Sequence, residues 1–265
     1  MKRKTLLTAI AGGMLAIPTF ASAEDVERED VVLTGLVRDF LISHPDMQHS
    51  QKSFGVRTGL VEEELGDDGL PVLDTSNDYS RGMISGVSSF NQWFRDVPGV
   101  NVSFPYAITL EPHPDKPGVM YYAREKQMSG AMKYFFPADG MGYNDTQTVN
   151  TGTHNFYFTY ELRTMFTYSD PDERDYEMDF SFVGDDDVWV YINGKLAVDI
   201  GGVHSQADGS VNLDDAAEDL GLEAGGSYEL VLFFAERHTT QSNFRIETTL
   251  YLEEVAPTIV SPLYD

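Results

Sequence analysis

The chain has 265 residues, of which 42% are hydrophobic and 12% aromatic, enough to bury a full core in one large domain. It carries 43 acidic against 18 basic residues, a formal net charge of -25, so its surface repels nucleic acid and anionic membranes and attracts divalent cations. It contains no cysteine, which excludes disulfides and lipoprotein anchoring.

The first 23 residues have the pattern of a secretory signal peptide. A basic start at 2–4 precedes an apolar stretch at 6–17, and the small residues Ala21, Ser22 and Ala23 form a cleavage triplet. We therefore predict cleavage after Ala23 and an exported single domain at 24–265, secreted or on the cell surface, with the periplasm also open. A membrane anchor is disfavoured because the apolar run is short, and no later stretch is long enough to span a bilayer.

The first half of the mature chain predicts two strands, one helix and long loops. The segments 31–40 and 100–110 are apolar or alternating, as in strands, and Pro105 places the second at a sheet edge or a bulge. Between them, 48–81 reads as long loops over a core. The segment 88–97 predicts a helix, with a capping box at its start. The apolar face of this helix consists of Phe90, Trp93, Phe94 and Val97.

The second half predicts a series of strands separated by Gly, Asp and Asn turns. Asn193-Gly194 is the preferred dipeptide of a two-residue hairpin turn. The predicted strands are 156–168, 176–182, 188–192, 196–200, 228–234 and 244–250. This pattern is typical of an all-β fold, an antiparallel β-sandwich or jelly roll with one short helix and long loops.

Three consecutive carboxylates, Asp185, Asp186 and Asp187, interrupt the most strand-like part of the sequence. Consecutive residues of a regular strand point to opposite faces, so neighbouring aspartates share one cation only if the backbone bends between them. Calcium suits such a site because it takes six to eight oxygen ligands without rigid geometry. The alternative is an acidic, solvated turn. Asp199 is a candidate fourth metal ligand, although a turn or capping role fits it equally well.

Two later loops carry polar groups that suit ligand binding. The first is Gly201-Gly202-Val203-His204, and the second runs from 235 to 243 after a buried strand. Within the second, Glu236 and Arg237 are also consistent with a buried ion pair. Trp189 and Tyr191 suggest a sugar-stacking platform, although alternating aromatics in a strand are more often core. The predicted ligand-binding residues are Asn193, Gly201, Gly202, His204, Arg237, His238 and Asn243.

With these segments, the chain resembles the fibro-slime domain family, a branch of the PA14-like β-sandwiches. The strings that carry the resemblance are SFNQWFRDVPGVNVSFPYAITL, HNFYFTYELRTMFTY, FVGDDDVWVYINGKLAVDIGGVHSQADGSVNL and FFAERHTTQSNFRIET. The family implies secreted or surface proteins of slime, adhesion and extracellular matrix. Related yeast modules are calcium-dependent lectins in which two consecutive aspartates joined by a cis peptide hold the ion. The resemblance places that pair on Asp185-Asp186, with Asp186-Asp187 as the alternative.

No catalytic motif stands out. The chain has no G-x-S-x-G, H-E-x-x-H or phosphate-binding glycine loop, and carboxylates are so abundant that a glycosidase pair carries no information. The sequence therefore predicts a module without enzymatic activity, and the resemblance implies that this module binds an extracellular glycan or matrix component in a calcium-dependent manner. The alternative is a structural or self-associating slime or surface-layer component in which the aspartates only stabilise the fold.

Overall fold

The computed structural model describes residues 28–48, 55–123, 134–150 and 152–257. The predicted signal peptide at 1–23 lies outside the described residues. None of the helices in the described segments has both the length and the apolar character needed to cross a membrane.

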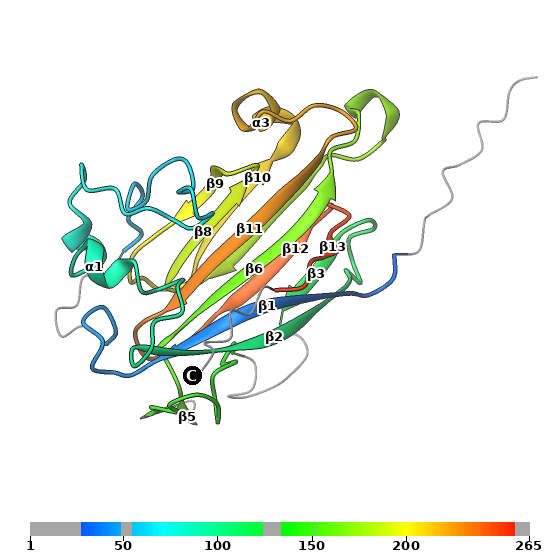
Figure 1. Cartoon of the computed structure of the whole chain (residues 1–265). Coiled ribbons are helices and arrows are strands. Elements are labelled where there is room, and N and C mark those ends of the chain that lie inside the picture. The colour runs from blue at the N-terminus through cyan, green and yellow to red at the C-terminus, as the bar shows by residue number, and fades with distance from the viewer. Residues whose placement is uncertain (1–27, 49–54, 124–133, 151, 258–265) are drawn as a thin grey trace, which may run out of the picture.

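The fold is an antiparallel β-sandwich, which confirms the predicted class (Figure 1). The strands run in the order β10-β7-β12-β3-β2-β1-β6-β11-β8-β9, with β13 beside β6, and β4 and β5 form a separate hairpin. Their bounds are β1 Val31–Phe40, β2 Asn101–Pro112, β3 Met120–Ala123, β4 Gln147–Val149, β5 Gly152–His154, β6 Phe158–Thr167, β7 Asp179–Gly184, β8 Asp187–Ile192, β9 Lys195–Ile200, β10 Ala207–Asn212, β11 Ser227–Glu236, β12 Phe244–Thr248 and β13 Glu253–Glu254.

Strand β2 is where one layer continues into the other. It pairs with β1 along most of its length but with β3 only at Glu111 and Pro112. Strands β1, β6, β11, β8 and β9 therefore form one layer, and β10, β7, β12 and β3 form the other. Pro105 lies where β2 has a partner on one side only, as its missing N–H requires. Phe234 of the first layer contacts Phe182 and Phe244 of the second, which places the main core between the layers.

A second core covers the outside of β8 and β11. Residues 55–100, which include α1 (Val87–Phe90) and the 3-10 turn η1 (Tyr79–Gly82), gather on this side of the sheet (Figure 1). Trp93 packs against Trp189 with ring centroids 6.1 Å apart, and Phe94 packs against Phe233 at 4.9 Å. Strand β8 is consequently buried on both faces, and the long loops predicted before residue 81 form part of this cover.

The predicted helix at 88–97 is too long. The structure has one helical turn, α1, followed by turns that continue to Arg95. The side chain of Asn101 explains the early end: its Oδ1 accepts from Val97 N at 3.0 Å, and its Nδ2 donates to the carbonyls of Gln92 and Arg95. These bonds occupy backbone groups that a longer helix needs for its own ladder.

A second α-helix, α3 (Leu213–Leu220), was not predicted. Asn212 caps it, accepting from the N–H groups of Asp214 and Asp215 at 3.0 Å each, and Gly221 ends it with a φ of 68°. The sequence contained this signal, an Asn cap before two acidic residues and a closing glycine.

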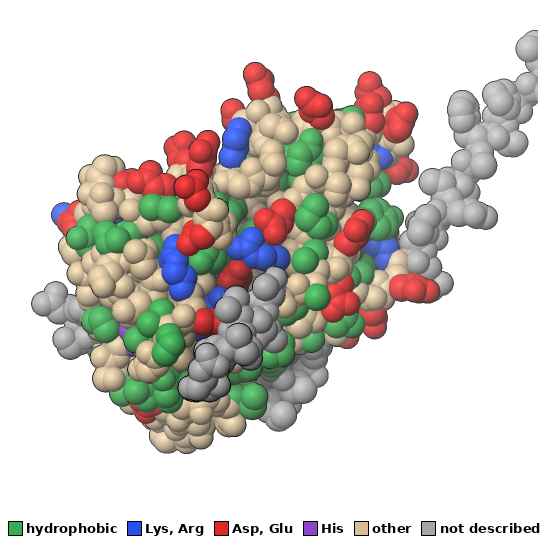
Figure 2. All heavy atoms as spheres, in the orientation of Figure 1, with side chains coloured by type: hydrophobic (Ala, Val, Ile, Leu, Met, Phe, Trp, Pro, Cys, Tyr) green, Lys and Arg blue, Asp and Glu red, His purple; other side chains and the backbone are tan. Residues whose placement is uncertain are grey.

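Carboxylates are spread over the face seen in Figure 2, where basic side chains appear singly or in small groups beside them. The structure thus keeps the acidic surface that the composition indicates.

Candidate functional site

The three aspartates lie where the chain passes from one layer to the other. Strand β7 ends at Gly184 in the second layer and β8 begins at Asp187 in the first, so Asp185 and Asp186 form the crossing. The peptide bond between Asp185 and Asp186 is cis, as the resemblance implied.

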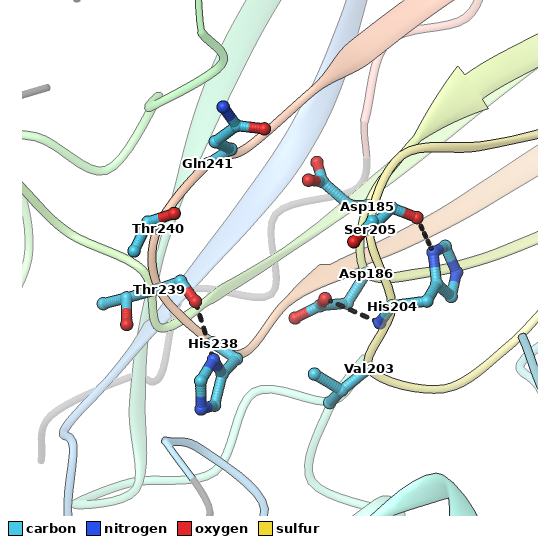
Figure 3. Close-up of a pocket in the computed structure, with 9 residues that line it drawn as sticks. All are labelled: Asp185, Asp186, Val203, His204, Ser205, His238, Thr239, Thr240 and Gln241. Carbon is cyan, nitrogen blue, oxygen red and sulfur yellow. Dashed lines mark hydrogen bonds between the residues drawn. The ribbon is translucent and has the colours of Figure 1, made fainter. Parts of the chain in front are cut away.

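Asp185 and Asp186 line one cavity of about 300 Å³ at the end of the sandwich. Figure 3 shows their carboxylates between two loops, one carrying Val203–Ser205 and the other residues 238–241. The remaining polar lining consists of His204, Ser205, His238, Thr239, Thr240 and Gln241. The cavity is thus a polar recess with two carboxylates on one wall.

Protein N–H groups hold each of these carboxylates in place. The Asp185 carboxylate accepts two hydrogen bonds from Asn243, one from its backbone N–H and one from its Nδ2 at 3.0 Å. Asp186 accepts from His204 N and Arg237 N, each at 3.2 Å. Each carboxylate oxygen can accept more than one bond, so this arrangement orients both groups without using up their ligand capacity.

Burial disfavours the ionised form of both carboxylates. It raises the pKa of Asp185 to about 6, while the hydrogen bonds from Asn243 act in the opposite sense. Burial also raises the pKa of Asp186 well above its usual value; the positive charge of Arg237 opposes this shift, and the neighbouring carboxylates reinforce it. A bound cation would favour the charged forms.

Asp187, predicted as a metal ligand, does not join the pair. Its Oδ1 accepts from Gly202 N at 2.5 Å, and its Oδ2 lies 2.7 Å from Nε and 2.6 Å from Nη2 of Arg237. Neither side chain of this ion pair is exposed. Alternation along β8 explains the divergence: Asp187 points to the same face as Trp189, away from the core between the layers.

Arg237, predicted as a ligand-binding residue, lies on the same side as Asp187. Its guanidinium lies 4.5 Å from the centre of the Trp93 ring and donates to the carbonyls of Asp46, Gly82 and Met83. Arg237 therefore fastens the outer cover to the sheet and pairs with Asp187 rather than with Glu236.

Asp199 and Asn193 also lie away from the cavity. Asp199 accepts from Gly59 N at 2.6 Å and Trp189 Nε1 at 3.0 Å, so its carboxylate faces the outer cover and not the aspartate pair. Asn193 forms the hairpin turn with a φ of 52°, and its Nδ2 donates to Leu220 O at 2.9 Å. The turn prediction is confirmed, whereas the predicted metal role of Asp199 and ligand role of Asn193 do not fit these positions.

The other predicted ligand residues border the cavity or support it. His204 and His238 line it, and Asn243 touches Asp185. Gly202 has a φ of 95° and supplies the N–H for Asp187, while a Cβ on Gly201 would lie 2.7 Å from Arg57 O. The two glycines thus allow the backbone to pack closely at this point.

Four polar lining residues were not predicted individually: Ser205, Thr239, Thr240 and Gln241. The polar run HTTQSN after a buried strand was the available signal. Trp189 and Tyr191 have no exposed surface, so they belong to the outer core and not to a sugar platform.

Among the described residues, no three His, Cys, Asp or Glu side chains are placed to hold a metal ion together. Any ion on Asp185 and Asp186 would take its further ligands from hydroxyl, amide or backbone oxygens, or from water. The ring nitrogens of His204 face the carbonyls of Ser205 and Ile200, and Nδ1 of His238 faces Thr239 O. An oxygen-rich site of this kind fits calcium better than a transition metal.

Comparison with known proteins matches the PA14 domain family model to residues 115–263, a segment that contains the aspartate pair and both cavity loops. Proteins psiQ and psiR of Dictyostelium discoideum are each 36% identical to the chain, over 231 and 247 residues. These alignments cover 84% and 89% of this chain but only 21% and 23% of the relatives. Among solved structures, a PA14 sugar-binding domain from an RTX adhesin aligns over 83% of this chain and 96% of its own, at 8% identity and a TM-score of 0.32.

Proposed function

The chain belongs to the PA14 domain family, and from that premise we propose that it is an exported carbohydrate-binding adhesion module in which calcium at Asp185 and Asp186 holds the sugar. It acts as a binding module and not as an enzyme. The predicted leader at 1–23 supports a secreted or cell-surface location, with an extracellular glycan or matrix component as partner.

One observation carries the calcium proposal: two adjacent, buried carboxylates line the same open recess. Asp185 is 5% exposed and Asp186 4% exposed, so solvent screens their mutual repulsion poorly. A divalent cation removes that repulsion, and the surrounding hydroxyls and amides offer the oxygen ligands that calcium prefers. When bound, calcium supplies a positive centre to which vicinal sugar hydroxyls can coordinate.

The shape and lining of the recess suit a sugar. A volume of about 300 Å³ with an open mouth accommodates one or two sugar rings at a chain end. Thr239, Thr240 and Gln241 offer donors and acceptors opposite the carboxylates (Figure 3). They are the groups expected to discriminate between sugars.

Calorimetry on chelator-treated protein tests the metal. Calcium should bind with a stoichiometry of one and raise the melting temperature, and Asp186→Asn should abolish both responses. Asp208→Asn is the matched control, because it removes the same charge from an exposed position on β10. An unchanged melting curve of the wild type on calcium addition would remove the calcium claim.

A glycan array with calcium and with chelator tests the sugar. We expect binding that chelator abolishes and Asp186→Asn eliminates. Glycan binding that persists in chelator would contradict the mechanism. A blank array together with concentration-dependent association in the ultracentrifuge would favour the structural, self-associating alternative.

A further inference from the structure

Glu236 is a buried carboxylate that the proposed calcium site does not use as a ligand. It is the last residue of β11 and has no exposed surface. Phe234 points into the core between the layers and Ala235 into the outer cover, so alternation directs Glu236 toward the inner side. Ala235 pairs with Asp187, which brings Glu236 level with Asp186 at the end of the sheet.

The carboxylate of Glu236 has little to compensate its charge. Its Oε1 accepts from His238 N at 3.3 Å, and its Oε2 makes no hydrogen bond of ordinary geometry within the described residues, where the Ser242 hydroxyl is a weak, uncharged partner. No ion pair of the described segments includes it. Arg237, although next in sequence, turns to the opposite face and pairs with Asp187.

The charges that act on Glu236 are those of the proposed calcium ligands. Burial, followed by the negative charges of Asp186 and Asp185, raises the pKa of Glu236 well above its usual value. The Ser242 hydroxyl and the His238 N–H act in the opposite sense but carry no charge. Three carboxylates are therefore gathered at one recess, and within the described segments the nearest guanidinium, that of Arg237, is paired with Asp187.

Such a cluster costs free energy that an apolar or amide side chain would avoid, because a buried charge needs a counter-charge. Glu236 is not placed with the aspartates as a third metal ligand. Its charge can still act on an ion in the recess, since electrostatic attraction is weakly screened in a buried setting.

We propose that Glu236 is a positioning residue of the calcium site, which strengthens cation binding through its buried charge and destabilises the protein while the site is empty. This inference rests on the proposed calcium function. The charge of Glu236 makes the stability of the fold depend on the bound ion, so that the module is most stable where calcium is plentiful, as outside a cell.

The test is Glu236→Gln, which keeps the shape of the side chain and an acceptor for His238 N but removes the charge. In chelator, the variant should melt at a higher temperature than the wild type. In calorimetry, its calcium Kd should rise roughly ten- to a hundredfold, the size expected when one buried charge near a divalent ion is removed. Glu253→Gln on β13, an exposed glutamate, controls for the change in net charge and should alter neither quantity.

The outcomes separate the two proposals. If the wild type does not bind calcium, the proposed function fails and the role of Glu236 fails with it. If the wild type binds calcium and Glu236→Gln binds equally well, only the role of Glu236 is overturned. Should Glu236→Gln not fold, Glu236→Asp retains the charge and should keep the Kd within about threefold of the wild type despite some loss of packing. A tenfold loss in Glu236→Asp would also overturn the inference.

Discussion

Arg237 and Asp187 form an ion pair that solvent does not reach: Nη2 lies 2.6 Å from Oδ2, and neither side chain has exposed surface. The same guanidinium stacks over Trp93 and donates to three carbonyls of the outer cover. The pair therefore joins the outer cover to β8 directly beside the calcium-binding candidates.

Asp187→Asn should reduce the free energy of unfolding by about 3 to 5 kcal/mol, because it leaves the Arg237 charge buried without a partner. Urea denaturation measures this, with Asp208→Asn as the exposed control. If Arg237 instead contacted ligand, Asp187→Asn would change sugar binding and leave stability near the wild-type value. That result would contradict the structural role.

The surroundings of Asp214 predict that the stability of the protein depends on pH. Burial would raise the pKa of its carboxyl, but hydrogen bonds from Arg174 and Tyr168 outweigh this and hold the pKa below its usual value. A lowered folded-state pKa stabilises the protein at pH values above the unfolded pKa of about 3.9, and this contribution is lost as the pH falls through the folded value. Asp214→Asn should therefore cost about 1 to 2 kcal/mol at neutral pH and progressively less below pH 4.

Thermal melts of Asp214→Asn and the wild type between pH 3 and pH 7 measure this difference. Asp215→Asn, which is also in the first turn of α3, controls for the loss of a helix N-terminal charge. A difference in melting temperature between variant and wild type that stays constant down to pH 3 would show that the contacts of Asp214 with Arg174 and Tyr168 are not its source.

A substitution at Gln241 distinguishes an effect on sugar binding from an effect on metal binding. It lies on the loop opposite the carboxylates and is exposed, and its Nε2 donates to Tyr134 Oη at 2.9 Å. Gln241→Ala should weaken glycan binding about tenfold, the loss of a hydrogen-bonding contact, while the calcium Kd stays unchanged. Titration of both ligands into the same variant checks this, and a parallel loss of calcium binding would mean that Gln241 supports the ion instead.

Local chemistry in the sequence was sufficient to predict the Asn193-Gly194 turn, because it depends on residues adjacent in the chain. The cis-linked pair Asp185-Asp186 was implied by the resemblance to the PA14-like family, since local chemistry alone left a solvated acidic turn as an alternative. The partner of Asp187 was not predictable in this way, since Arg237 is 50 residues away and meets it only through the pairing of β8 with β11. Asp199 illustrates a different limit. Alternation along β9 places it opposite Val198 and Ile200, but the outer cover that buries this face comes from residues 55–100, whose docking no local pattern specifies.

Gly184 leaves no room for a side chain immediately before the aspartate pair. A Cβ there would lie 2.6 Å from Asn243 O, and Asn243 in turn holds the Asp185 carboxylate at 3.0 Å. Gly184→Ala should therefore cost about 1 to 3 kcal/mol of stability and also weaken calcium binding, because backbone must move to relieve the contact. Melting curves and calcium calorimetry on one preparation measure both effects.

Gly209→Ala is the matched control for this variant. Gly209 lies on β10 opposite Phe182, and the nearest atoms to a Cβ there would be side-chain atoms of Val198 and Ile200. Side chains yield more readily than backbone, so this variant should lose less stability and should bind calcium as the wild type does. If Gly184→Ala shows the expected loss of stability but binds calcium as the wild type does, the position of Asn243 does not matter for the ion. The link from Gly184 through Asn243 to Asp185 would then be wrong.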